Sequence, residues 1–132
     1  MKFTPDNITK LKENQVFVFG SNEAGIHGAG AAKLAHKKFG AVYGVGFGLL
    51  GQTFAIPTKD LEIHTLPLDK IESYIHFFLL EAMNHPDNEF LVTKIGCGLA
   101  GYSEQEIANL FKSKFIPENV TLPESFYNII NS

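Results

Sequence analysis

An uninterrupted apolar run, Val16–Phe19, stops abruptly at Gly20 and sets narrow limits on how this chain can fold. A strand with one face in water alternates apolar and polar side chains, whereas a strand covered on both faces does not need to. We therefore expect Val16–Phe19 to be an inner strand of a sheet that is covered on both sides. Phe90–Ile95 has the same character, Gln52–Pro57 is a third strand candidate, and Val120–Leu122 could add a short last strand.

The segments between these strands carry helical signals. Ala29–Phe39 predicts a short helix with a small-residue face, and Gly40 stands at its C-terminal capping position. Ser103 and Glu106 provide the S-x-x-E start of a later helix. Parallel strands need crossover connections that lay helices over the sheet, so this alternation predicts a mostly parallel sheet covered on both faces. The expected fold class is α/β, in the form of a three-layer α/β/α sandwich.

The clearest helical pattern spans Asp69–Asn84, where apolar residues recur at i, i+3 and i+4. Asp69 and Glu72 form a variant of the capping box at its start. The run Phe77–Leu80 is wide for one face of a surface helix. It predicts core burial on more than one side of the helix, with a dimer interface as the alternative.

Composition limits what the chain can be. With 132 residues, 45% of them hydrophobic, and twelve Phe, it predicts one compact domain over residues 1–132. The formal charge of -3 and the lack of a long Lys/Arg cluster disfavour duplex nucleic acid as a partner. The sequence has neither a signal-peptide run nor the ~20 apolar residues that span a bilayer, and Cys97 is its lone cysteine. We expect a soluble cytoplasmic protein without a membrane partner, and the sequence leaves its oligomeric state open.

Glycine-rich loops follow two of the predicted strands. The first, Gly20–Ala31, lies between a strand and a helix, and the second, Gly96–Tyr102, again joins a buried strand to a capped helix. Glycine lets backbone N–H groups approach an anion closely, and a helix start adds donors and a favourable dipole. Ligands of such sheets bind beyond the carboxyl ends of the strands. The pair of loops therefore predicts a site that clasps a diphosphate, whereas either loop alone is equally well explained by simple turn geometry.

Two familiar nucleotide-binding motifs do not apply. Gly46–Gly51 matches G-x-G-x-x-G, but it precedes a predicted strand instead of opening a helix, so we interpret it as a flexible loop. The chain contains no G-x-x-x-x-G-K-[ST] sequence, which disfavours a P-loop nucleoside triphosphatase. The histidines lack zinc-ligand spacing, so neither a metal site nor a cofactor is predicted.

At these residues the chain resembles the macrodomain superfamily, and most of all the branch that includes terminal ADP-ribose protein glycohydrolases. The resemblance rests on three blocks in the same order: His27–Gly30 leading to Lys37–Gly40, then Ile56–Lys59, then Ile95–Leu99. They cover most of residues 16–112, and the I-G-C-G-L block is the most specific. The resemblance implies a macrodomain-like fold with ADP-ribose as the ligand.

The same resemblance implies roles for individual residues. Asn22 matches the loop asparagine that contacts the distal ribose, and Gly28–Ala31 and Gly96–Tyr102 match the phosphate-contacting segments. In the glycohydrolase branch the lysine matching Lys59 is a covalent nucleophile, and an aspartate follows the I-G-C-G-L block. Here that position is Ala100, so the acid-base help that a lysine adduct needs is missing.

Three side chains have competing interpretations. His27 could donate to phosphate or act as a general base, or it could simply pack near the cleft. Cys97 could be a nucleophile at a helix start, but a small apolar role is the commoner one. Lys59 could act on phosphate or ribose, or be an exposed lysine. The candidate catalytic residues are Lys59, Asn22 and His27, and the candidate ligand-binding residues are Gly20, Ser21, Asn22, Gly25, His27, Gly28, Ala29, Gly30, Ala31, Thr58, Gly96, Cys97, Gly98, Leu99, Ala100, Gly101 and Tyr102.

Three functions follow in order of support. The first is binding of ADP-ribose or a related adenosine diphosphate ribose metabolite. The second is an ADP-ribosyl hydrolase that acts on a modified protein or nucleic acid. The third is an interaction protein with a degenerate nucleotide pocket, suggested by the broad apolar helix.

Overall fold

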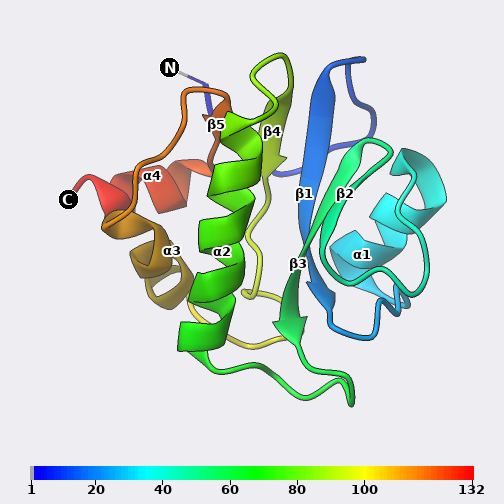
Figure 1. The fold of residues 1–132 in the computed structure, drawn as a ribbon. Coiled ribbons are helices and arrows are strands. Elements are labelled where there is room, and N and C mark those ends of the chain that lie inside the picture. The colour runs from blue at the N-terminus through cyan, green and yellow to red at the C-terminus, as the bar shows by residue number, and fades with distance from the viewer. Residues whose placement is uncertain (1) are drawn as a thin grey trace.

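In the computed structural model, which describes residues 2–132, the chain forms a five-stranded sheet in the order β2-β3-β1-β4-β5 (Figure 1). The central strand β1 (Gln15–Asn22) has parallel neighbours β3 (Thr53–Lys59) and β4 (Glu89–Val92), and β5 (Val120–Thr121) continues the parallel set. β2 (Gly48–Leu50) runs antiparallel to β3 at one edge. The mostly parallel sheet expected from the sequence is confirmed.

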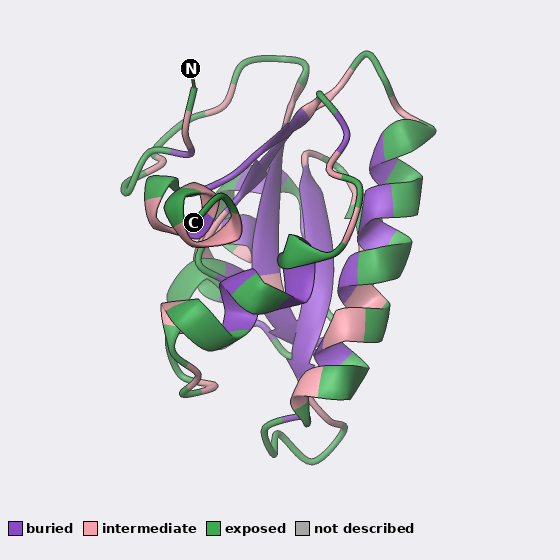
Figure 2. Cartoon of the chain, turned by 90° about the vertical axis from the view of Figure 1, so that its left-hand side faces the viewer, coloured by how far each residue is buried: buried purple, intermediate pink, exposed green. Residues whose placement is uncertain are grey.

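Helices cover both faces of this sheet, and Figure 2 shows its strands as mostly buried. α1 (Gly30–Leu34) and the π-helical turn Ala35–Phe39 lie on one face, and Gly40 then caps the turn at a φ of 96°. The opposite face carries α2 (Leu68–Met83), α3 (Glu104–Lys112) and α4 (Glu124–Ile130). The chain is an α/β protein, and this layering is the one expected for a sandwich.

The apolar run in β1 is buried on both faces, as predicted. Phe17 and Phe19 pack with the small-residue side of α1, whereas Val16 and Val18 join the larger core beneath α2, α3 and α4. All four side chains are at most 2% exposed. Each contributes roughly 1.5–3 kcal/mol through burial, so β1 anchors both halves of the core.

The two predicted capping boxes have different outcomes. In α3, Ser103 Oγ accepts from the Glu106 N–H, and the Glu106 carboxylate accepts from the Ser103 N–H, as expected. The box expected in α2 is wrong, because the helix begins directly after Pro67, which leaves the predicted cap residue inside the first turn. Glu72 instead pairs with Lys114 Nζ at 2.8 Å.

The wide apolar run in α2 is buried on one side only. Phe78 and Leu79 are buried, whereas Phe77 and Leu80 are 54% and 44% exposed. The expected burial on more than one side is therefore wrong, because α2 belongs to an outer layer with the sheet beneath it. α2 has 16 residues. Across residues 2–132 none of the helices combines the length and the apolar character that crossing a membrane requires.

Some element boundaries also differ from expectation. Part of Gly46–Gly51 is the edge strand β2, so the interpretation as a flexible loop is wrong for those residues. The strand expected over Phe90–Ile95 ends at Val92, because the chain turns just beyond it, where the Ile95 N–H donates to the Thr93 carbonyl oxygen at 2.8 Å. α4 was not anticipated at all, since its seven residues carry too little periodic pattern to stand out.

Candidate functional site

The carboxyl ends of β1 and β4 lie side by side, and the chain leaves them in opposite directions. From β1 it turns to α1 on one face of the sheet, and from β4 it turns to α3 on the other. In open α/β sheets this divergence leaves a crevice in which ligands bind. A cleft of about 470 Å³ lies at this point.

Both predicted loops and the end of β3 contribute to the walls of this cleft. The predicted site residues that line it are Gly20, Ser21, Asn22, Gly28, Ala29, Gly30, Ala31, Thr58, Lys59, Gly96, Gly98, Leu99 and Ala100. The lining residues that sequence reasoning missed are Ile26, Ala32, Ile63, Thr93, Lys94 and Ile95. Five other candidates, Gly25, His27, Cys97, Gly101 and Tyr102, lie outside the set that lines the cleft in residues 2–132.

The Asn22 side chain shapes the first loop. Its Oδ1 accepts from the Ile26 N–H at 2.9 Å, and its Nδ2 donates to the Ile26 carbonyl oxygen at 2.8 Å. The amide is therefore already engaged at both ends by the backbone of its own loop. Asn22 lines the cleft and stabilises its own loop, and its amide keeps one further N–H donor and one further acceptor lone pair.

The first loop is built directly against the segment that precedes β2. A Cβ on Gly25 would lie 2.4 Å from the Gly44 carbonyl carbon, and a Cβ on Gly46 would lie 2.3 Å from the Asn22 carbonyl oxygen. Ser21 Oγ also donates to the Gly46 carbonyl oxygen. Glycine is thus required on both sides of a backbone-to-backbone contact that holds the loop in place.

For two glycines that line the cleft, no contact within the protein explains why the residue is glycine. A Cβ on Gly28 or Gly98 would meet no protein atom within 4 Å, and neither residue has a positive φ. The two come from different loops and both face the cleft. Glycine at these two places leaves backbone open at the surface of the cleft, which is the property that close approach of a ligand requires.

The end of β3 forms the third wall and ties the two loops together. Thr58 Oγ1 donates to the Ser21 carbonyl oxygen at 3.2 Å, and the Lys59 carbonyl oxygen accepts from the Glu23 N–H at 2.8 Å. On the other side, Thr65 Oγ1 donates to the Ala100 carbonyl oxygen at 3.1 Å. Lys59 is among the residues that line the cleft.

Lys94 is a second cation in the cleft, and sequence reasoning missed it. It follows β4 directly and lines the cleft, with its Nζ 3.3 Å from a Glu104 carboxylate oxygen. The charged residues among those that line the cleft are Lys59 and Lys94, and none of the carboxylates in residues 2–132 lines it. The position of Lys94 at the carboxyl end of a buried strand is the sequence signal that could have identified it as a cleft residue. The cleft favours an anion.

His27 lies beneath the first loop, away from the cleft. It is 1% exposed, and its ring packs between Phe19 and Tyr43, 5.6 Å and 5.5 Å away by ring centroids. Burial lowers the pKa of His27, repulsion from His36 lowers it further, and the Val45 backbone opposes both. Within the described chain neither ring nitrogen has a hydrogen-bond partner of normal geometry. The structure gives His27 a packing position under the loop.

The second loop turns two of its candidates toward the interior. Cys97 is half-buried against the larger core, and burial raises the pKa of its thiol to about 11, with Glu104 adding to the effect. A thiol with that pKa is protonated at neutral pH, so the small apolar role fits better than a nucleophile. The Tyr102 hydroxyl donates to the Leu66 carbonyl oxygen, and its ring packs on the core instead of facing a ligand.

The two positions that bear on lysine chemistry offer no acid-base partner. Ala100 lines the cleft where the resembling branch has an aspartate. The Asp60 carboxylate accepts from the Glu62 and His64 N–H groups, each at 2.9 Å, and these bonds, His64 first, lower its pKa. Asp60 therefore serves its own turn and does not line the cleft next to Lys59.

A second groove of about 660 Å³ adjoins the cleft. It shares Gly30, Ala31, Thr93 and Lys94 with the cleft and continues between the N-terminal segment 4–9 and α1. Together the two hollows form an elongated site that passes the start of α1. The N-cap residue of α1, Ala29, makes no side-chain capping bond, so the first-turn N–H groups stay available there.

Comparison with protein-family models, with curated proteins and with solved structures found no match for this chain. In residues 2–132 no three or more His, Cys, Asp or Glu side chains gather in a way that could hold a metal ion.

Proposed function

We propose that this protein binds ADP-ribose, or a closely related adenosine diphosphate ribose metabolite, in the cleft between its two glycine-rich loops, in the manner of a macrodomain. The diphosphate would lie against Gly28–Ala31 and Gly96–Ala100. The proposal combines the resemblance of the sequence blocks with the chemistry of the cleft.

The pair Gly28 and Gly98 is the observation that carries the proposal. Each has an ordinary φ and open space where a side chain would stand, and each lines the cleft from a different loop. A turn that needed glycine for its own geometry would have a positive φ or a close neighbour. Closely approached backbone N–H groups on both sides of a crevice suit the oxygens of a diphosphate.

The charge of the cleft and the length of the cleft and groove together narrow the choice of ligand further. Lys59 and Lys94 line the cleft, and no carboxylate in residues 2–132 lines it, so the cleft favours an anion even though Lys94 pairs with Glu104. The adjoining groove gives room for a group on one side of the diphosphate, and the part of the cleft near Lys59 gives room on the other. A diphosphate with adenosine on one side and a sugar on the other would use both spaces, whereas inorganic phosphate or AMP would leave one of them empty.

Binding is better supported than hydrolysis. Lys59 lines the cleft, and this keeps an ADP-ribosyl hydrolase as the second candidate. A lysine nucleophile also needs a group that moves protons, but Ala100 has none and Asp60 is held in its own turn. Incubation with ADP-ribosylated protein and with ADP-ribosylated nucleic acid, for wild type and Lys59→Ala, tests this candidate. Release of ADP-ribose by the wild type and not by Lys59→Ala would make the hydrolase the first candidate function and binding alone the second.

A thermal-shift panel with ADP-ribose, NAD, ADP, AMP and inorganic phosphate tests the binding proposal. A ligand at 100 times its Kd adds about 2.7 kcal/mol to the free energy of unfolding, which is a readily measured rise in Tm. We expect ADP-ribose to give the largest rise and phosphate the smallest. Isothermal titration calorimetry then gives the Kd, and absence of any heat or shift with ADP-ribose at millimolar concentration would overturn the proposal.

A further inference from the structure

The turn Asp60–His64, between β3 and α2, holds one residue in a costly backbone conformation. Among residues 2–132, Ile63 is the one non-glycine residue with a positive φ, at 66°. A β-branched side chain in the left-handed region is a genuine outlier, and it persists only where the surroundings impose it. Such residues cluster at ligand sites, and Ile63 lines the cleft.

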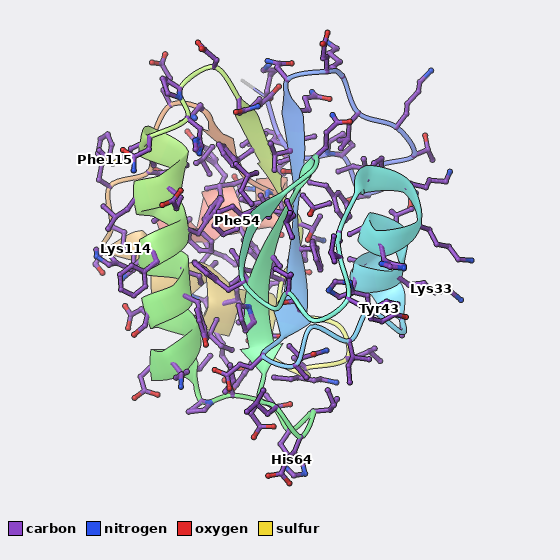
Figure 3. All side chains as sticks on the ribbon, turned by 45° about the vertical axis from the view of Figure 1, so that its right-hand side comes forward. Lys33, Tyr43, Phe54, His64, Lys114 and Phe115 are labelled. Atoms are coloured by element: carbon purple, nitrogen blue, oxygen red, sulfur yellow. The ribbon has the colours of Figure 1, made fainter. Side chains whose placement is uncertain are left out.

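Hydrogen bonds within the turn impose this conformation. The Asp60 carboxylate accepts from the Glu62 and His64 N–H groups, and the Asp60 carbonyl oxygen accepts from the Ile63 N–H at 3.1 Å. The Asp60 N–H donates to the His64 carbonyl oxygen at 2.8 Å. Figure 3 shows His64 at the outer tip of the turn, which projects from the body of the protein.

The base of the turn is joined to both glycine-rich loops. Lys59 forms an antiparallel bridge with Thr65, and Thr65 Oγ1 bonds to the Ala100 carbonyl oxygen. The turn therefore cannot move away without disturbing the second loop. Ile63 lines the cleft from the turn and Leu99, 73% exposed, lines it from the second loop, so the two offer apolar surface to one space.

Ile63 belongs to the part of the cleft that the adjoining groove does not share. That groove shares residues 30, 31, 93 and 94 with the cleft, and neither Ile63 nor Leu99 lines it. Lys59 likewise lines the cleft alone. A ligand whose adenosine lies in the groove would therefore present its second sugar to Ile63 and Leu99.

We propose that Ile63, held by the Asp60–His64 turn, is a specificity-determining contact for the sugar beyond the diphosphate, with Leu99 as the opposing contact. This inference rests on the proposed function. The carbon-bearing face of a sugar ring loses water against these two side chains, and a ligand that ends at the diphosphate gains nothing from them. The strained turn sets Ile63 apart from its neighbour Leu61, which is 69% exposed and does not line the cleft.

Calorimetric titration with ADP-ribose and with ADP, on wild type and variants, tests the inference. Ile63→Gly and Ile63→Asn both suit a left-handed backbone, so both should fold with a Tm near that of wild type. We expect each to weaken ADP-ribose binding about fivefold and to leave the Kd for ADP within about twofold. Leu61→Ala, the matched control from the same turn, should change neither Kd.

The outcomes separate this inference from the function beneath it. If the wild-type protein shows no measurable binding of ADP-ribose, the proposed function fails, and the inference fails with it. If wild type binds ADP-ribose and both Ile63 variants bind it equally well, the inference alone is overturned. Equal weakening of ADP and ADP-ribose would also overturn it, because the contact would then be with the diphosphate or the fold.

Discussion

The glycines of this protein belong to two groups that look alike in the sequence and differ in the structure. Gly25 and Gly46 have backbone atoms of another segment 2.3–2.4 Å from where a Cβ would lie, so they hold the first loop in place. Gly28 and Gly98 have no protein atom within 4 Å of that position and line the cleft. The first pair serves the fold, whereas the second pair leaves the backbone open at the surface of the cleft. A glycine-rich loop therefore has to be assessed residue by residue before it is assigned as a binding loop.

The largest expected effect comes from filling a glycine of the first group. Gly46→Ala places a Cβ against the Asn22 carbonyl oxygen and the Glu23 backbone, which cannot give way as a flexible side chain can. We expect the free energy of unfolding in urea to fall by about 3 kcal/mol, the upper end for overpacking. Val42→Ala, at an exposed residue of the same segment, is the control and should change it by less than about 0.5 kcal/mol. Equal stability of the two variants would show that the loop contact is not tight.

The next largest effect should come from filling a glycine of the second group, which should weaken ligand binding and leave the stability of the fold unchanged. Gly98→Ala should leave the free energy of unfolding unchanged or raise it by about 0.4–1 kcal/mol, because Gly98 lacks a positive φ and a Cβ there would meet no protein atom within 4 Å. The added methyl group in the cleft should weaken ADP-ribose binding by about tenfold or more, measured by calorimetry. Gly101→Asn is the control: it changes the same loop outside the cleft at a φ of 88° that asparagine tolerates. Unaltered affinity in Gly98→Ala would remove the main support for the site.

A smaller effect should follow from removing one cation. Lys94→Ala should weaken ADP-ribose binding about fivefold, and the remaining affinity should depend less on salt concentration. Its pairing with Glu104 is solvent-exposed, so the stability change should stay within about 1 kcal/mol. Lys33→Ala is the matched control, since Lys33 is an exposed residue of α1 that does not line the cleft (Figure 3). Similar losses in both variants would indicate general charge attraction in place of a local contact.

The smallest effect concerns the packing under the first loop. The pKa of His27 is lowered in the folded protein, so the unfolded chain binds a proton first as pH falls. The stability that His27 contributes is therefore complete above its ordinary pKa of about 6.5 and is lost as pH falls from there through the lowered value. Urea unfolding at pH 7.5 and pH 5.5 should show a larger loss of stability for wild type than for His27→Phe. His36 and Tyr43, which face the ring, are present in both proteins, and identical losses would contradict a role for His27.

Much of the fold could be predicted because it depends on local patterns. The run in β1, the capping box of α3 and the cap at Gly40 each involve residues a few positions apart, and each was confirmed. The errors lie where distant segments meet. Whether Phe77 is exposed depends on what covers α2, and whether Gly48–Leu50 forms a strand depends on β3 lying beside it.

The candidate site also has parts that local sequence patterns predict and parts that depend on contacts between distant segments. The two loops were identified from the sequence, because a strand, glycines and a helix start follow one another along the chain. The third wall of the cleft is predicted only in part. The sequence points to Thr58 and Lys59 but not to Ile63, since no sequence pattern indicates that an isoleucine adopts a left-handed backbone conformation. His27 was placed in the loop correctly, yet its ring turns to Phe19 and Tyr43.

The alternation of strands and helices and the two glycine-rich loops follow from local sequence, because strand periodicity, helix capping and glycine freedom act over a few residues. Tertiary contacts are needed to establish which glycines line the cleft, that Lys94 lines it together with Lys59, and that His27 is buried. Those outcomes depend on which carboxyl ends become neighbours in the sheet and on what the opposite segment leaves empty. Contacts between segments far apart in the chain settle both, and no local pattern encodes them.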